Sequence, residues 1–238
     1  MIKTDDMQEH KQAERIQTSI LNAAEKKALV WLAHRQPKWM TSDMLTGIGF
    51  FGALVIAAGY VLVNKDINFL WLASLGLVIN WYGDSLDGTL ARVRNTQRPV
   101  YGYYLDHTVD GINESLMFIG LGLSGLIHLP LSLAILVVYL LLTINVSVNA
   151  HLKKEFRLTY AKLGPTEFRI LGIIANTLFI LVRPLREFAC GFQIFGRSIT
   201  LHALDLVGIF VLLLLLAIYF ATIISDARDY ARIDPPKK

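Results

Sequence analysis

Long blocks of apolar residues fill most of this chain, and short polar segments separate them. Six such blocks lie near residues 42–64, 69–91, 102–127, 130–150, 168–189 and 201–225. A helix of about 20 apolar residues is long enough to cross a bilayer. The pattern therefore predicts an all-α integral membrane protein with six transmembrane helices.

The N-terminal segment, residues 1–38, is more polar than the rest. From about residue 8, charged side chains alternate with isolated apolar ones such as Ile16, Ile20 and Leu29. That spacing favours an interfacial amphipathic helix on the membrane surface, with a helix packed on its own protein as the alternative. Pro37 is expected to end it. We divide the chain into this segment, a six-helix transmembrane domain that carries the chemistry (39–226) and a basic tail (227–238).

Basic residues gather in the connections near residues 92–101 and 151–167 and in the tail. The positive-inside rule assigns such segments to the cytoplasm. Both termini and the 92–101 connection are therefore expected in the cytoplasm, with the protein in the cell inner membrane or an equivalent membrane. Arg183, Arg186 and Arg197 fall on the expected outside, and the first two could snorkel to the interface.

The composition agrees with a membrane protein, since 54% of the 238 residues are hydrophobic and a soluble domain is rarely so apolar. The net charge of +4 suits a surface beside anionic lipid headgroups. We expect no nucleic-acid partner, because the basic residues lie at block ends and form no single patch. The single cysteine, Cys190, excludes an intrachain disulfide framework and a cysteine-based zinc site.

Four carboxylates stand out against this apolar background: Asp84, Asp87, Asp106 and Asp110. Ionisable groups at membrane depth are costly and by default mark a functional site. On helices, the members of each pair lie three or four residues apart and share one face. Two such faces together form a cage of the hard oxygen ligands that Mg²⁺, Mn²⁺ or Ca²⁺ prefer. Helix capping and pairing with nearby arginines are the less favoured alternative.

The residues around these carboxylates suit a phosphate-containing substrate. Gly88 and Ala91 leave room for a ligand near the backbone, and Arg92 could hold a phosphate oxygen by paired hydrogen bonds. One or two divalent cations would relieve the repulsion between the carboxylates and bridge the oxygens of a diphosphate. Asp110 is the deepest from the connection, and we expect it to be the base that takes a proton from an attacking hydroxyl.

The pattern D-x-x-D-G-x-x-A-R, followed by G-x-x-x-D-x-x-x-D, resembles the signature of the CDP-alcohol phosphotransferase (CDP-alcohol phosphatidyltransferase) family, which makes phospholipid headgroups. Nine residues, 93–101, separate the two halves, against about eight in the family, and this extra loop residue leaves both helical faces intact. The signature is carried by Asp84, Asp87, Gly88, Ala91, Arg92, Gly102, Asp106 and Asp110.

The resemblance implies a six-helix fold, usually a homodimer, with two divalent metals, Mg²⁺ or Mn²⁺, held by the four aspartates. It implies that a cytidine diphosphate group binds near Gly88, Ala91, Arg92 and Gly102, with Asp110 as base. An acceptor hydroxyl would attack the β-phosphorus and release CMP. The segment 40–47 is similar to the start of the family's first span, so Asp43 and Thr46 are expected to touch the nucleotide. An ordinary helix cap at residues 41–43 is the alternative.

Polar residues further along the chain are candidate ligands of the acceptor. Asparagines four residues apart share a helix face, where helix–helix contact is their more frequent role. Glu167 could instead cap a helix start, and basic residues could meet lipid. Glu114, one turn beyond Asp110, could tune its proton affinity or pair with a cation. The acceptor candidates are Asn145, Asn149, Lys153, Arg157, Glu167 and Arg169.

The sequence thus predicts a membrane phosphotransferase that uses a CDP-linked substrate, preferably CDP-diacylglycerol, and a small polar alcohol with or without a phosphate group. A CDP-ethanolamine or CDP-choline phosphotransferase acting on diacylglycerol is the nearest alternative, and the Asp106–His107 pair resembles that branch. The glycine, alanine and arginine of the signature disfavour a prenyl-diphosphate transferase. A cation transporter is disfavoured because its carboxylates would lie near the bilayer midplane.

Overall fold

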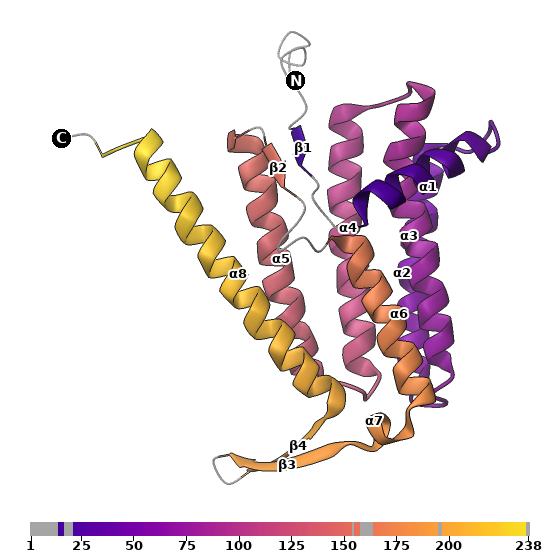
Figure 1. Ribbon diagram of the computed structural model, residues 1–238, viewed down its shortest axis with the longest axis vertical. Coiled ribbons are helices and arrows are strands. Elements are labelled where there is room, and N and C mark those ends of the chain that lie inside the picture. The colour runs from indigo at the N-terminus through magenta and orange to yellow at the C-terminus, as the bar shows by residue number, and fades with distance from the viewer. Residues whose placement is uncertain (1–13, 17–20, 154, 158–163, 195–196, 237–238) are drawn as a thin grey trace.

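The computed structural model describes residues 14–16, 21–153, 155–157, 164–194 and 197–236 (Figure 1). Six long helices fall on the six predicted apolar blocks. The helices are α1 (Asn22–Arg35), α2 (Ser42–Leu62), α3 (Phe69–Arg94), α4 (Pro99–Leu123), α5 (Leu129–Lys153), α6 (Pro165–Leu181), α7 (Arg183–Glu187) and α8 (Ala203–Ile233). The strands are β1 (Glu14–Ile16), β2 (Glu155–Arg157), β3 (Ala189–Ile194) and β4 (Arg197–His202).

Three of the described helices, α2, α5 and α8, are long and apolar enough to cross a membrane. These three helices support the integral membrane class and are candidates for three of the six predicted spans. Helices α3 and α4 have 26 and 25 residues, but they carry the acidic and other polar residues of the candidate site. Helix α6 has 17 residues. For these three helices, membrane crossing stays a prediction.

Helices α2 and α3 make the closest helix contact because glycines line it. A Cβ on Gly83 would lie 2.2 Å from the nitrogen of Gly49, and one on Gly52 would lie 2.4 Å from the nitrogen of Asn80. Only glycine allows two backbones to approach so closely. Helix α4 packs on α2 and α6 packs on α3. The acidic turn of α3 is thereby held by a helix that packs on α2 and α6.

Helix α1 packs on its own protein, which favours the alternative to a surface helix. Its Leu29 and Ala33 are buried against Leu45, Leu86 and Leu90. The helix begins at Asn22, well after the predicted start near residue 8, and ends at Arg35, just before Pro37. An interfacial amphipathic helix is therefore not confirmed.

A glutamate of α1 joins three helices at one end of the molecule. The side chains of Trp81 and Thr166 donate hydrogen bonds to Glu25 Oε1 at 2.9 and 2.5 Å. The parallel β1–β2 pair lies at the same end of the helices (Figure 1). This end also holds the α3–α4 connection. Through Glu25, α1 links the start of α6 to α3, the helix that carries the first two aspartates.

The opposite end contains structure that the apolar pattern did not predict. Helix α6 ends at Leu181, well before the predicted residue 189, because Pro184 has no N–H to continue the helical hydrogen bonds. The antiparallel hairpin β3–β4 occupies the stretch expected to be a plain connection (Figure 1). Helix α8 runs obliquely to the other helices and continues to Ile233, past the predicted end of the last span near residue 225.

Two carboxylates, one fully buried and one partly buried, connect α8 to α5 and to the residue before it. Asp205 is fully buried and accepts hydrogen bonds from the backbone nitrogens of His128 and His202, at 2.7 and 2.8 Å. Near the other end, Asp226 accepts hydrogen bonds from the amides of Asn145 and Asn149, at 3.2 and 2.7 Å. These two contacts fix the long apolar helix against its neighbour.

Candidate metal and nucleotide site

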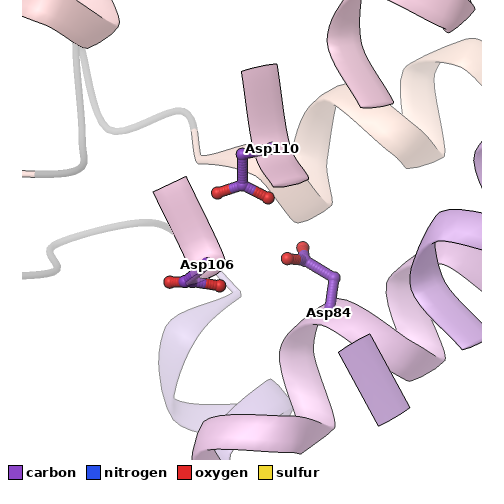
Figure 2. Close-up of side chains that lie close together, drawn as sticks. All are labelled: Asp84, Asp106 and Asp110. Atoms are coloured by element: carbon purple, nitrogen blue, oxygen red, sulfur yellow. The ribbon is translucent and has the colours of Figure 1, made fainter. Parts of the chain in front are cut away.

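Three of the four predicted aspartates meet between α3 and α4 (Figure 2). Asp84, Asp106 and Asp110 each offer a carboxylate oxygen, and these oxygens lie within 4.8 Å of one another. The helices meet there because only residues 95–98 connect them. Asn95 ends α3 in the left-handed conformation with φ 54°, which asparagine tolerates better than most residues, and Pro99 opens α4.

The donor set of this aspartate cluster (Asp84, Asp106 and Asp110) fits a divalent metal ion. All three ligands are carboxylates, the hard oxygen donors that Mg²⁺ and Mn²⁺ prefer. All three side chains are partly buried, so their mutual repulsion is poorly screened by water. A bound cation would remove that repulsion, and the cluster is therefore a plausible metal site by both chemistry and geometry.

The fourth aspartate, Asp87, lies beside this cluster but outside the group of three. Its Oδ2 accepts a hydrogen bond from Thr46 Oγ1 at 2.6 Å, and its Oδ1 accepts one from the Gly88 nitrogen. Its carboxylate is still close enough to be repelled by Asp106 and Asp84. The backbone oxygen of Asp87 accepts a hydrogen bond from Ser42 Oγ at 2.8 Å. The start of α2 is thus fixed on the acidic turn of α3.

The predicted nucleotide contacts at the start of α2 have partners within the chain. Thr41 Oγ1 accepts a hydrogen bond from the Met44 nitrogen at 3.2 Å and so caps the helix. Asp43 pairs with Arg98, whose Nη2 lies 2.5 Å from Asp43 Oδ1. This hydrogen bond raises the pKa of Arg98 above its ordinary value. Capping thus belongs to Thr41, while Asp43 pairs with Arg98 and Thr46 is hydrogen-bonded to Asp87 of the acidic turn.

The two glycines of the signature are not required by packing. A Cβ on Gly88 would meet only the mobile end of Arg92, with Nη1 at 3.4 Å, and a Cβ on Gly102 would meet nothing within 4 Å. This contrasts with Gly83, where the backbone of α2 fills the space. Arg92 is exposed, and its Nη2 donates to Thr89 Oγ1 at 2.9 Å. Small residues beside open space and an exposed guanidinium are compatible with a bound nucleotide.

Arg169 of α6 lies beside the aspartate cluster, although the sequence placed it among the acceptor ligands. Its Nη2 donates to Asp84 Oδ2 at 2.5 Å and its Nε donates to Asn80 Oδ1 at 2.9 Å. Asn80 in turn donates to the backbone oxygen of Gly49 at 2.9 Å. Such outer contacts orient a carboxylate that serves as a metal ligand. Asn80 was not predicted as a site residue, although its spacing four residues before Asp84 was a usable signal.

Other acceptor candidates are engaged elsewhere in the structure. Asn145 and Asn149 bind Asp226, which is the helix–helix role that the sequence left open. Glu167 accepts hydrogen bonds from the backbone nitrogens of Gly164 and Leu21, at 2.9 and 3.0 Å, and so caps α6. The predicted contacts of the Lys153 and Arg157 side chains lie outside the described part of the structure. For all of these residues, an acceptor contact stays a prediction.

Comparison with known proteins agrees with this site. The family described as CDP-alcohol phosphatidyltransferase matches residues 39–224, a range that includes both aspartate pairs. Over 89 residues the chain is 32% identical to the archaetidylinositol phosphate synthase of Pyrococcus horikoshii. That match covers 37% of this chain and 44% of the relative's length. The family match spans all six long helices, apart from the end of α8.

Proposed function

This chain belongs to the CDP-alcohol phosphatidyltransferase family, and we propose that it transfers a phosphatidyl or other substituted phosphoryl group from a CDP-linked donor to an alcohol, with release of CMP. The observation that carries this proposal is the meeting of Asp84, Asp106 and Asp110 close to the start of α4, where a Cβ on Gly102 would meet nothing within 4 Å. A divalent cation held there would stabilise charge on the phosphate oxygens and on the leaving phosphate.

The residues divide into three roles in this proposal. Two Mg²⁺ or Mn²⁺ ions would be held by the four aspartates, Asp84, Asp87, Asp106 and Asp110. Asp110 lies furthest along α4 from the α3–α4 connection, and it takes the proton from the acceptor hydroxyl. The donor's CDP group lies over the open backbone at the ends of α2, α3 and α4. Its proposed contacts are Asp43, Thr46, Gly88, Ala91, Arg92 and Gly102.

We place the lipid on the donor, as CDP-diacylglycerol, and a small polar alcohol at the acceptor position. The apolar faces of α2, α5 and α8 support a lipid substrate, because each of these helices could lie in the bilayer. The name of the Pyrococcus horikoshii relative describes a product that carries an inositol phosphate. Inositol phosphate is accordingly one of the acceptors to test, beside unphosphorylated alcohols.

The membrane arrangement completes the proposal. Helices α2 to α6 and α8 supply six spans, with both termini and the aspartate cluster at the cytoplasmic side. The basic residues of the α3–α4 connection, Arg94 and Arg98, support this orientation. A homodimer follows from the family and is testable by mass measurement in detergent.

The deciding experiment is CMP release by purified protein in detergent with Mg²⁺ or Mn²⁺. CDP-diacylglycerol is offered with serine, inositol, inositol phosphate, glycerol phosphate, ethanolamine or choline, and in parallel CDP-ethanolamine or CDP-choline is offered with diacylglycerol. We expect CMP with CDP-diacylglycerol and one acceptor. CMP in the parallel set alone would reverse the donor assignment. No CMP in any pairing, from folded protein that binds metal, would overturn the proposed reaction.

A further inference from the structure

A second group of buried polar side chains lies next to the aspartate cluster. Glu114 follows Asp110 by one turn on α4, and Asn113 lies on the same side of that helix. Within the described part of the chain, three buried atoms have no hydrogen-bond partner: Asn113 Oδ1, Glu114 Oε2 and Arg169 Nη1. Buried polar atoms are normally paired, and unpaired ones call for an explanation. In an apolar helix assembly a ligand is the natural explanation.

These groups come from different helices and lie near one another. Arg169 of α6 interacts electrostatically with Asp110 and with Tyr139 of α5. Glu114 of α4 interacts with Arg169, and Tyr139 interacts with Glu114. Polar groups of three helices thus lie near one another and near Asp110.

Aromatic contacts fix the ring of Tyr139 in this region. Phe168 meets it edge-on, with ring centroids 6.5 Å apart and an interplanar angle of 89°, and Phe118 lies at 6.4 Å. Asn113 is only 5% exposed. A fixed ring and buried partners make a site whose hydrogen-bonding groups are already in place before a ligand arrives.

We propose that Glu114, Tyr139 and Arg169 form an acceptor subsite for the non-reacting polar groups of a small alcohol. This proposal rests on the proposed function and names the substrate class of the same site. Glu114 Oε2 accepts a hydrogen bond from a second hydroxyl or from an ammonium group of the acceptor. Arg169 Nη1 donates to a hydroxyl, carboxylate or phosphate oxygen, while the reacting hydroxyl lies against Asp110.

The chemistry of these groups selects the kind of acceptor. An acid and a guanidinium with free hydrogen-bonding capacity require a ligand with polar groups beside its reacting hydroxyl, such as a polyol, a hydroxy amino acid or a phosphorylated polyol. Diacylglycerol has one free hydroxyl and two long chains, so it would leave Glu114 Oε2 and Arg169 Nη1 without a hydrogen-bond partner. A site built to hydrogen-bond a substrate group strongly rejects an analogue that lacks it.

The test compares Glu114→Gln and Tyr139→Phe with a matched control, Ser115→Ala. Ser115 is the next residue on α4, and its hydroxyl donates only to its own helix, to the Gly111 oxygen at 2.7 Å. Binding of inositol, inositol phosphate, glycerol phosphate and serine is measured by calorimetry on protein loaded with Mg²⁺ and CDP. The KM values for the acceptor and for CDP-diacylglycerol are measured on the same preparations.

We expect Glu114→Gln to weaken acceptor binding about tenfold, because a charged hydrogen-bond acceptor is replaced by a neutral amide oxygen. Tyr139→Phe should weaken it by a smaller factor, and Ser115→Ala should leave it unchanged. The donor KM should stay unchanged in all three variants, because the proposal places none of these three side chains against the donor. Glu114→Asp, which keeps the carboxylate, should restore part of the lost affinity.

Three results would overturn the subsite. The first is unchanged acceptor affinity in both Glu114→Gln and Tyr139→Phe. The second is an equal rise of donor and acceptor KM, which indicates a structural role. The third is a wild-type protein that binds none of these alcohols. Calorimetry does not depend on turnover, so acceptor binding that is lost in Glu114→Gln but never yields CMP would support the subsite and overturn the proposed reaction.

Discussion

Arg169 Nη2 lies 2.5 Å from Asp84 Oδ2, although 85 positions separate the two residues in the chain. The side chains are 13% and 19% exposed, so water screens this ion pair weakly. The pair joins α6 to the aspartate cluster, and Asn80 holds the same guanidinium from α3. The position of Asp84 is therefore set by tertiary contacts as well as by its own helix.

Arg169→Lys should weaken metal binding about 10- to 100-fold, because lysine keeps the charge but cannot hold Asp84 and Asn80 together. Titration with Mg²⁺ or Mn²⁺, followed by calorimetry, measures the change without turnover. Arg183→Lys is the control. Arg183 lies in α7, just beyond the other end of α6, and forms an exposed ion pair with Glu187. Equal metal affinity in the two variants would show that Arg169 does not orient Asp84.

Asp110→Asn should lower kcat about 100- to 10,000-fold, the usual contribution of a general base. The amide keeps the shape of the side chain and one oxygen, so we expect the donor to bind with nearly unchanged affinity. Single-turnover CMP release and calorimetric binding of the donor separate the two effects. A variant with near-normal turnover would remove Asp110 from the role of base.

Asp84→Asn and Asp87→Asn should both raise the concentration of Mg²⁺ or Mn²⁺ needed for half-maximal CMP release. We expect the larger rise for Asp84→Asn, because Asp84 is one of the three clustered carboxylates and Asp87 is already hydrogen-bonded to Thr46. An unchanged metal requirement in both variants would be incompatible with the proposed cage.

We expect Gly83→Ala to lower the stability of the protein and Gly88→Ala to weaken binding of the donor. At Gly83 the added carbon meets the α2 backbone at 2.2 Å, and overpacking of this kind typically costs about 1–3 kcal/mol. At Gly88 it meets only the arginine side chain, so that variant should fold normally and raise the donor KM about tenfold, the effect of one methyl group in a tight site. Thermal unfolding in detergent and donor KM distinguish them. A donor KM unchanged in Gly88→Ala would move the nucleotide away from this turn.

Asn149→Ala tests whether this asparagine joins helices or binds the acceptor. It removes a hydrogen bond to Asp226 and the partner of the Tyr230 hydroxyl, and we expect a loss of about 1 kcal/mol. For a chain of this size, that loss lowers Tm by about 2–4 °C. The acceptor KM should not change. A raised acceptor KM at normal Tm would instead return Asn149 to the acceptor site.

The long helices and the meeting of three aspartates could be predicted from sequence because both depend on local spacing. Apolar blocks mark helices by themselves, and Asp106 and Asp110 share a face in any helix. The connection of only a few residues between α3 and α4 then brings Asp84 to them. The carboxylate pairs by themselves indicated a divalent metal and a phosphate-containing substrate, and the resemblance to a known family supplied the cytidine nucleotide.

Other features depend on contacts between distant segments and could not be read from local patterns. The sequence gives no sign that Arg169 reaches Asp84, or that Asp226 takes the amides of Asn145 and Asn149. The early end of α6 had a visible cause in Pro184, but the β3–β4 hairpin after it has no strong turn signal of its own. Four-residue spacing pointed to Asn145 and Asn149 as a pair, while only the fold could identify their partner.

The glycine contact between α2 and α3 divides the molecule into a fixed part and a part that can move. Where the glycines meet, the two backbones are in direct contact, with no side chain between them that could change rotamer. Asp84 and Asp87 therefore lie on a tightly packed pair of helices, which serves as a wall for the site. Any opening that admits a lipid donor or releases its product has to come from displacement of α4, α5, α6 or α8 against that wall.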